Sequence, residues 1–213
     1  RLTLIMKKNY PDLPYVLIGH SMGSYMSRKY ASIYGDELDG VIFLGTGNQP
    51  KAVVDSGLKL AHIAKLVRGE RYRSELLNTI MFGAYNKRIK DNRTANDWLT
   101  KDTKIVDEYL SDPKCSYKFT ANAYIGFLNV IKYDIDKKNI AKTPDKLPVL
   151  FASGLEDPVG DYGKGVKKAF KMYTKYVDNV ELYLYEDDRH ELHSETDRED
   201  IFSDLYEWIE ENV

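Results

Sequence analysis

The pattern of apolar positions changes along the chain, from strand-like runs near both ends to helical periodicity in the middle. Residues 15–19 and 41–44 are apolar at consecutive positions. This is typical of parallel strands that are covered on both faces. Residues 1–9 and 24–34 have helical character, and Gly35 ends the second helix. A strand, a helix and a second strand with short links predict a parallel pair joined by a right-handed crossover.

The same alternation returns in the last third of the chain. Residues 149–153 and 180–185 read as strands, and residues 164–177 read as an amphipathic helix. A closing helix is expected over 201–211, with Phe202, Leu205, Trp208 and Ile209 on its inner face. The pattern therefore predicts an α/β protein with a mainly parallel sheet flanked by helices.

The middle of the chain shows helical periodicity and no strand-like run. Helices are expected within residues 53–67, 74–85, 102–110 and 120–133. We interpret residues 46–146 as a helical insertion between two sheet strands. The expected organisation is then a core segment at 1–45, the insertion at 46–146 and a second core segment at 147–213.

Composition narrows the class of protein. With 43% hydrophobic and 30% charged residues, the 213-residue chain has the balance of a soluble globular protein. Its net charge of −2 is spread without a basic stripe, so we expect neither a nucleic-acid partner nor an anionic membrane partner. The apolar runs are strand-sized, which predicts no transmembrane segment. The single cysteine, Cys115, suits a reducing, cytoplasmic location and is expected to be a buried apolar residue. Four scattered histidines and no paired cysteines argue against a structural zinc site.

One short motif carries candidate chemistry. Residues 19–23 read Gly-His-Ser-Met-Gly and lie between a predicted buried strand and a predicted helix, the setting of a nucleophile elbow. Gly19 and Gly23 lack a Cβ and would allow the sharp turn. Ser21 would then project at the carboxyl edge of the sheet, with the N–H of Met22 as an oxyanion donor. The simpler alternative is a glycine-rich connection that happens to contain a serine.

A serine nucleophile needs a base and an orienting carboxylate, and both can be placed at the same edge. Asp157 follows the predicted strand 149–153, and His190 follows the predicted strand 180–185. The carboxyl ends of parallel strands meet at one edge, and the order Ser, Asp, His is that of hydrolases with an elbow serine. The sequence therefore predicts a triad of Ser21, Asp157 and His190.

Other polar residues near these positions compete for the same roles. Asp161 lies closer to the following helix than Asp157 does, and His193 is expected to begin the turn into the last helix. The side chain of His20 should point away from Ser21 and have a buried, hydrogen-bonded structural role. His62 is expected on the surface or in the packing of the inserted helices, and Glu156 is expected to be a surface charge.

Longer stretches resemble a known family. They are "GHSMGS", "FGAYNKRI", "NDWLTKD", "DPKCSYKFTANAY", "LPVLFASGLEDPVGDYGKGV" and "LYEDDRHELHSE". They resemble the bacterial lysophospholipase and monoacylglycerol-lipase-like branch of the α/β-hydrolase superfamily, the serine-aminopeptidase-type hydrolases. The resemblance implies an α/β-hydrolase fold with Ser21, Asp157 and His190 as the triad. It also implies that the insertion is a cap that roofs the acyl-binding cleft.

The resemblance implies an ester hydrolase that acts on monoacyl lipids without a metal or other cofactor. A transient contact with a membrane surface is compatible with such substrates. The insertion contains the aromatic residues Phe82, Tyr85, Trp98, Tyr109, Tyr124 and Phe127. Their helical spacing favours packing in the interior of the insertion over contact with lipid. A peptidase is the less favoured enzyme class, because the sequence reveals no anionic pocket for a free amino terminus.

One departure from the family pattern concerns the start of the chain. Such hydrolases have about four further strands before the elbow, and a His-Gly loop after one of them donates the second oxyanion N–H. Residues 1–16 contain neither Gly nor His, and the chain begins at Arg1. We therefore expect these residues to be the C-terminal portion of a larger hydrolase, with the N-terminal part in cis or on another chain. Without the second donor the rate should fall ~10²–10³-fold, which leaves a non-catalytic, hydrolase-like binding protein as the alternative.

Overall fold

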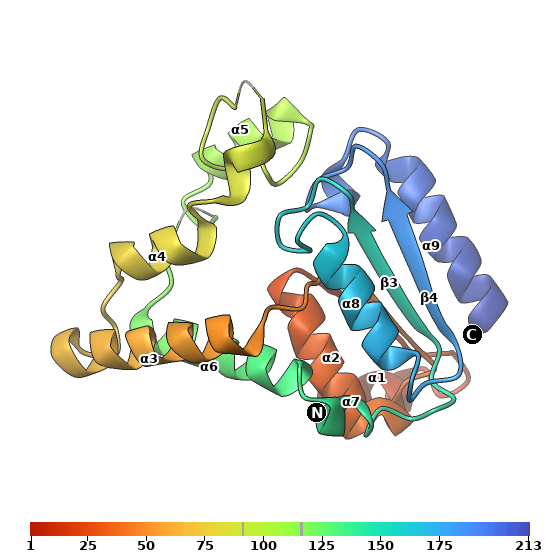
Figure 1. Ribbon diagram of the computed structural model, residues 1–213. Coiled ribbons are helices and arrows are strands. Elements are labelled where there is room, and N and C mark those ends of the chain that lie inside the picture. Colours follow the sequence, from red (N-terminus) through yellow and green to blue (C-terminus); the bar gives the residue numbers. More distant parts are fainter. Residues whose placement is uncertain (91, 116) are drawn as a thin grey trace.

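The computed structural model of the protein describes residues 1–90, 92–115 and 117–213. Its parallel sheet has the order β1-β2-β3-β4. The strands are β1 (Val16–His20), β2 (Gly40–Leu44), β3 (Val149–Gly154) and β4 (Val180–Tyr185). Helices flank the sheet and link its strands (Figure 1). The predicted α/β class and all four predicted strands are thus confirmed.

Helices cover the two faces of the sheet with different groups of side chains. On one face, α2 (Met22–Tyr34) and α8 (Lys164–Tyr173) pack against Val41, Phe43 and Phe151. On the other face, α9 (Arg198–Asn212) packs Leu205 and Trp208 against the sheet. Successive residues of a strand point to opposite faces, so strands covered on both sides must be apolar throughout. Every residue of β2 and β3 is buried, and Ser153 near the end of β3 is the one polar residue among them.

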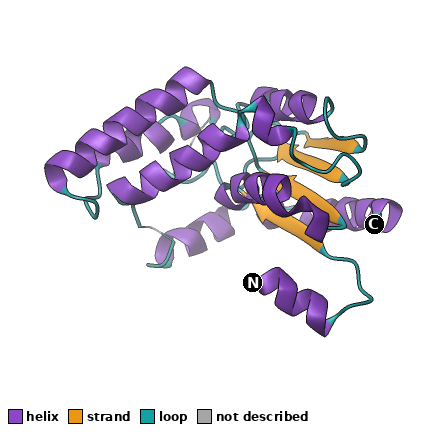
Figure 2. Cartoon of the chain, turned by 90° about the horizontal axis from the view of Figure 1, so that it is seen from below, coloured by secondary structure: helices purple, strands orange, loops and turns teal. Residues whose placement is uncertain are grey.

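β1 differs from the prediction that both of its faces are covered. It lies at the edge of the sheet in the part of the chain that the structure describes. Its Ile18 is 48% exposed, while Gly19 is buried. Helix α1 (Leu2–Asn9) precedes it and meets the body of the molecule through the hydroxyl of Thr3, which lies 2.6 Å from that of Tyr30. Figure 2 shows α1 beside the strands, on the far side from the long helices.

The region between β2 and β3 is helical. It contains α3 (Lys51–Arg68), α4 (Glu75–Phe82), α5 (Thr103–Ser111), α6 (Ala121–Asp134) and α7 (Lys137–Ile140). Ser74, Asp102 and Thr120 cap α4, α5 and α6 by accepting hydrogen bonds from backbone N–H groups. In Figure 1, α3 and α6 lie side by side and extend away from the sheet, and α5 lies above the carboxyl ends of β3 and β4.

The described residues also form short 3-10 turns, and two predicted helices differ from those observed. The turns are η1 (Gly35–Glu37), η2 (Tyr85–Arg88) and η3 (Leu192–Ser194). The predicted helix over 164–177 ends already at Tyr173. In α9 the prediction for Phe202 is wrong: its side chain is 44% exposed, and Ile201 is buried against the sheet instead. Leu205, Trp208 and Ile209 pack against the sheet as predicted, and the inner face of α9 is completed by Ile201, four residues before Leu205.

Candidate active site

Ser21 stands between β1 and α2 in a conformation that L-residues rarely adopt. Its φ is 54° and its ψ is −123°. The backbone is held there from both sides: the Ser21 N–H donates to the carbonyl of Leu44 at 3.0 Å, and the Ser21 carbonyl accepts from the N–H and the hydroxyl of Ser24 at 2.9 and 2.6 Å. A strained residue persists only where its surroundings fix it, and such residues gather at functional sites.

The side chain of Ser21 does not cap the helix that follows it. Ser21 is the N-cap residue of α2, a position where a serine oxygen normally accepts a hydrogen bond from the first turn. Here the side chain makes no such bond, and its Oγ lies 2.7 Å from Nε2 of His190. Met22 is the first residue of α2, so its N–H has no partner within the helix. The elbow therefore presents both a hydroxyl and an unpaired N–H at one edge of the sheet.

His190 is fixed between Ser21 and a buried carboxylate. Its Nδ1 lies 3.1 Å from Oδ1 of Asp157, and the two side chains are almost fully buried, at 2% and 0% exposure. Asp157 Oδ1 also accepts from the N–H of Val159 at 2.8 Å, and Oδ2 lies 3.4 Å from the hydroxyl of Ser153. With Nδ1 donating to the carboxylate, Nε2 is free to accept the proton of Ser21.

The structure thus brings together the three residues that the sequence predicted at this edge. Each lies just beyond the carboxyl end of a parallel strand: Ser21 after β1, Asp157 after β3 and His190 after β4. A glycine makes room for the imidazole, since a Cβ on Gly45, at φ 58°, would lie 3.0 Å from Cε1 of His190. The arrangement has the parts of a nucleophile, a base and an orienting carboxylate.

The residues that competed for the roles of base and orienting carboxylate are not part of the Ser21–His190–Asp157 path. Asp161 is exposed at φ 48° in the turn before α8, and His193 is exposed in η3. Glu156 is exposed, as is His62 on α3. Cys115 is half-buried rather than buried, so the prediction of a fully buried thiol is wrong.

His20 contacts both the backbone and the ring of His190. Its Nε2 lies 3.1 Å from the carbonyl of His190, and its ring centroid lies 4.8 Å from the His190 ring and 4.7 Å from the His193 ring. Burial, together with the neighbouring charges of His190 and His193, lowers the pKa of His20 to about 3. His20 is therefore neutral at ordinary pH and can donate Nε2–H to the His190 carbonyl, which agrees with the hydrogen-bonded role expected for it, although the residue is half-buried rather than buried.

Aromatic side chains of the helical region border the imidazole. The Trp98 ring centroid lies 5.0 Å from that of His190, Tyr85 lies 4.8 Å from Trp98, and Phe82 is stacked on Trp98 at 6.4 Å. Tyr124, by contrast, is fully buried among the helices. The predicted packing role thus holds for Tyr124, while Trp98 combines burial with direct proximity to the candidate base. Neither the elbow motif nor helical periodicity gave a signal for this contact.

Within residues 1–90, 92–115 and 117–213, no group of three His, Cys, Asp or Glu side chains has an arrangement that could hold a metal ion. None of the helices in these segments is long and apolar enough to cross a membrane.

Comparison with known proteins now identifies the family. The family model described as "Serine aminopeptidase, S33" matches residues 2–197. The chain belongs to this family of α/β hydrolases. A monoglyceride lipase homolog from Monkeypox virus is 22% identical to it over 206 residues, which are 96% of this chain and 66% of the viral protein. The chain thus spans slightly less than two thirds of the length of this viral relative.

Several solved structures have the same fold as this chain. A highly thermostable carboxyl esterase from Bacillus coagulans, in complex with glycerol, superposes with a TM-score of 0.91 at 28% identity, over 99% of this chain and 69% of the esterase. A lipase in an open form superposes with a TM-score of 0.86 at 27% identity, over 99% of this chain and 70% of the lipase. A monoglyceride lipase from Saccharomyces cerevisiae superposes with a TM-score of 0.71 at 20% identity, over 100% of this chain and 68% of the lipase. The expected α/β-hydrolase fold is confirmed.

Proposed function

We propose that the protein is a serine hydrolase that cleaves carboxylic esters, with Ser21 as nucleophile, His190 as base and Asp157 as the carboxylate that orients His190. The observation that carries this proposal is the continuous path from Ser21 Oγ to His190 Nε2 at 2.7 Å and from Nδ1 to Asp157 at 3.1 Å. It is supported by the strained elbow backbone and by membership of a hydrolase family.

In the proposed reaction, His190 Nε2 takes the proton of Ser21 as the serine oxygen attacks the ester carbonyl. Asp157 stabilises the imidazolium that forms. The Met22 N–H binds the oxyanion, and a segment outside residues 1–213, in cis or on another chain, supplies the second donor. His190 then protonates the leaving alcohol. It next activates a water that releases the acid and restores Ser21.

For the substrate, we propose monoacyl lipids, either monoacylglycerols or lysophospholipids. Relatives named monoglyceride lipase and carboxyl esterase support an ester substrate. The aromatic border of Phe82, Tyr85 and Trp98 offers apolar surface next to His190, which suits an acyl chain. Residues 46–146 would then form the cap of the cleft. Exposed Ile63, Leu66 and Val67 on α3 favour a transient contact of this cap with a lipid surface.

The test uses the intact protein and a fluorophosphonate probe, followed by turnover of a monoacylglycerol, a lysophospholipid and an amino-acid arylamide. A single adduct at Ser21 and preferred cleavage of the lipid esters are expected. Ser21→Ala should lower kcat at least about 10⁴-fold, because the nucleophile is lost. The control is Ser56→Ala, which changes an exposed serine on α3.

Each alternative predicts a different result in the same experiment. Retained turnover in Ser21→Ala would contradict the nucleophile assignment. Neither adduct nor turnover would favour the hydrolase-like binding protein. Faster cleavage of the arylamide than of any ester would favour a peptidase, the activity after which the family is named.

A further inference from the structure

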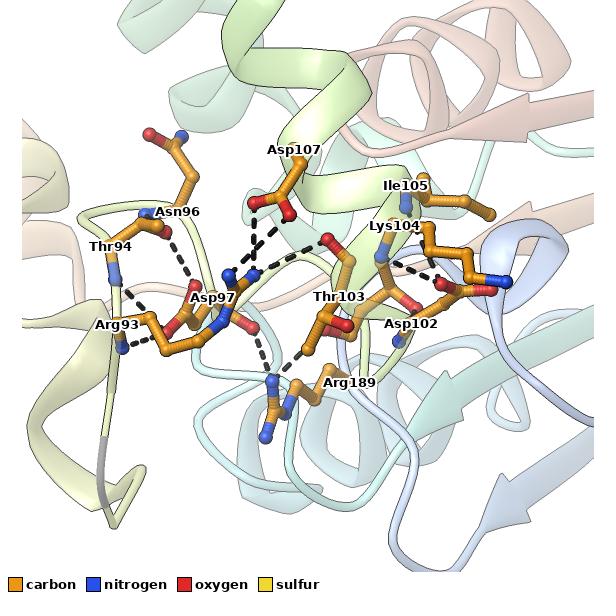
Figure 3. Close-up of polar contacts among 11 residues, drawn as sticks. Arg93, Thr94, Asn96, Asp97, Asp102, Thr103, Lys104, Ile105, Asp107 and Arg189 are labelled. Atoms are coloured by element: carbon orange, nitrogen blue, oxygen red, sulfur yellow. Dashed lines mark hydrogen bonds and ion pairs between the residues drawn. The ribbon is translucent and has the colours of Figure 1, made fainter.

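The loop that carries His190 is joined to the segment just before α5. The N–H of His190 donates to the Trp98 carbonyl at 3.4 Å, and the N–H of Glu191 donates to the Leu99 carbonyl at 2.7 Å. The guanidinium of Arg189 donates to the Asp97 and Thr100 carbonyls at 2.6 and 2.9 Å. Figure 3 shows the guanidinium of Arg189 below Asp97, with a dashed line between the two. The candidate base is thus anchored to a part of the chain about 90 positions earlier.

A buried carboxylate adds a further bridge between the two segments. Glu195 Oε1 accepts the N–H of Arg189 at 2.8 Å, and Oε2 accepts the N–H of Lys101 and the hydroxyl of Thr100, both at 2.9 Å. The Glu195 side chain is completely buried, and it belongs to neither of the two segments that it connects. The N–H of Arg189 lies in the peptide unit between Asp188 and Arg189, so the carboxylate fixes the backbone one residue before the base.

One segment is also held by hydrogen bonds of its own, and an ion pair joins the two segments beside Glu195. Asp97 accepts hydrogen bonds from the N–H of Thr94 at 3.1 Å and from the N–H of Arg93, which fixes the turn before Trp98 (Figure 3). The ammonium of Lys101 pairs with the buried carboxylate of Asp188, two residues before His190. A shift of the Glu195 carboxylate would therefore pass to the His190 loop rather than be absorbed by loose neighbours.

The chemistry of this contact indicates a role beyond simple packing. Burying a carboxylate is costly unless its oxygens are fully hydrogen-bonded, and a well-packed apolar residue would serve stability as well. An ionised carboxylate offers acceptors on both oxygens, and here each oxygen faces a backbone N–H. No apolar or amide side chain can satisfy both N–H groups at once. The buried charge therefore defines one geometry for the two segments.

We infer that Glu195 is a positioning residue for the reaction, which holds His190 in reach of Ser21 by locking the Arg189 peptide to the segment before α5. The inference rests on the proposed function, since it assigns His190 the role of base. Glu195 acts only through the backbone. It contacts no reacting atom, so its loss should affect the chemical step more than substrate binding.

The decisive variant is Glu195→Gln, which has nearly the same shape. Its amide nitrogen must face either the Arg189 N–H or the Lys101 N–H, so one bond becomes a donor–donor clash. Misplacement of a base by a fraction of an ångström lowers the rate strongly, and we expect kcat on the best ester to fall on the order of 10-fold. KM should change by less than about 2-fold, because the displaced base acts in the chemical step and not in substrate binding. The matched control is Glu199→Gln, an exposed site four residues later.

Hydrogen–deuterium exchange of both proteins provides a readout that does not need activity. In Glu195→Gln, amides in residues 186–192 and 97–101 should exchange faster together, while those of β1–β3 keep their wild-type protection. Unchanged exchange in the two segments, or faster exchange with an unchanged kcat, would overturn the inference. If the wild-type protein lacks turnover, the proposed function fails. Unchanged amide exchange in the two segments of Glu195→Gln would in that case still show that Glu195 does not hold them together.

Discussion

At the scale of single residues, the elbow depends on a glycine whose place no other residue can fill without displacement. A Cβ on Gly19 would lie 2.2 Å from Oγ of Ser27 and 2.6 Å from the carbonyl oxygen of Gly23. β1 and the first turn of α2 approach so closely there that the backbone itself blocks a side chain. Gly23 is different, because a Cβ at that position meets no atom within 4 Å.

Replacing Gly19 by Ala should lower the free energy of unfolding by ~1–3 kcal/mol, since an overpacked methyl group must push β1 and α2 apart. Gly23→Ala is the matched control and should be neutral or stabilising by up to ~1 kcal/mol, because alanine favours the helix. Urea titration of both variants measures the difference. Equal stability of the two proteins would contradict the close approach at Gly19.

At the scale of elements, a buried arginine holds the helical region to the sheet. Arg28 of α2 is 1% exposed. Its guanidinium donates to the Gly47 carbonyl at 2.8 Å and to the Asp134 carbonyl at 3.0 Å. Gly47 follows β2, and Asp134 ends α6. The guanidinium also lies 5.7 Å from the ring centroids of both Tyr25 and Tyr173. The Arg28 side chain therefore joins α2 to the loop after β2, to the end of α6 and to Tyr173 of α8.

Arg28→Met should lower the free energy of unfolding by ~3 kcal/mol, because it leaves two buried carbonyls without a donor and removes one of the two cations that compensate the Asp134 carboxylate. Arg68→Met removes an exposed arginine from the end of α3 and should have little effect. Thermal unfolding followed by circular dichroism measures both. A loss in Arg28→Met no larger than that in the control would show that α6 is held by apolar packing alone.

At the scale of the whole molecule, two buried groups give stability opposite dependences on pH. Burial raises the pKa of Asp134 to about 7, against the partial compensation of Arg28 and Lys29. The folded state therefore binds a proton that the unfolded chain loses above its ordinary pKa near 3.8, and stability falls as pH rises from about 4 to 7. His20, with its pKa lowered to about 3, acts in the other direction: stability falls as pH drops below about 6.5.

Asp134→Asn should remove the first of these dependences. The amide resembles the protonated acid, so the variant should match wild-type stability near pH 4 and exceed it increasingly up to pH 8. Asp145→Asn, at an exposed site, should follow the wild-type curve throughout. Denaturant titrations at several pH values give the comparison. A constant difference between Asp134→Asn and wild type would show that Asp134 titrates normally.

The sequence by itself determined the strands of the sheet and the three residues at its carboxyl edge. Buried parallel strands are apolar at every position, and the loops that follow them must emerge at one edge. Local pattern and chain order were therefore enough to bring Ser21, Asp157 and His190 together, although their catalytic roles stay predictions. Capping residues such as Asp102 and Thr120 likewise act within one turn of the helices they begin.

Only the tertiary structure decided which surfaces are covered and which distant segments meet. The exposure of Ile18 depends on what packs beside β1, and that of Phe202 depends on how α9 is seated on the sheet. Neither is a property of a local window. The contact of Glu195 with Thr100 spans 95 positions, and that of Arg28 with Asp134 spans 106. Such charged residues look like solvated surface positions in a sequence. They are buried here because folding supplies hydrogen-bond partners that no periodicity encodes.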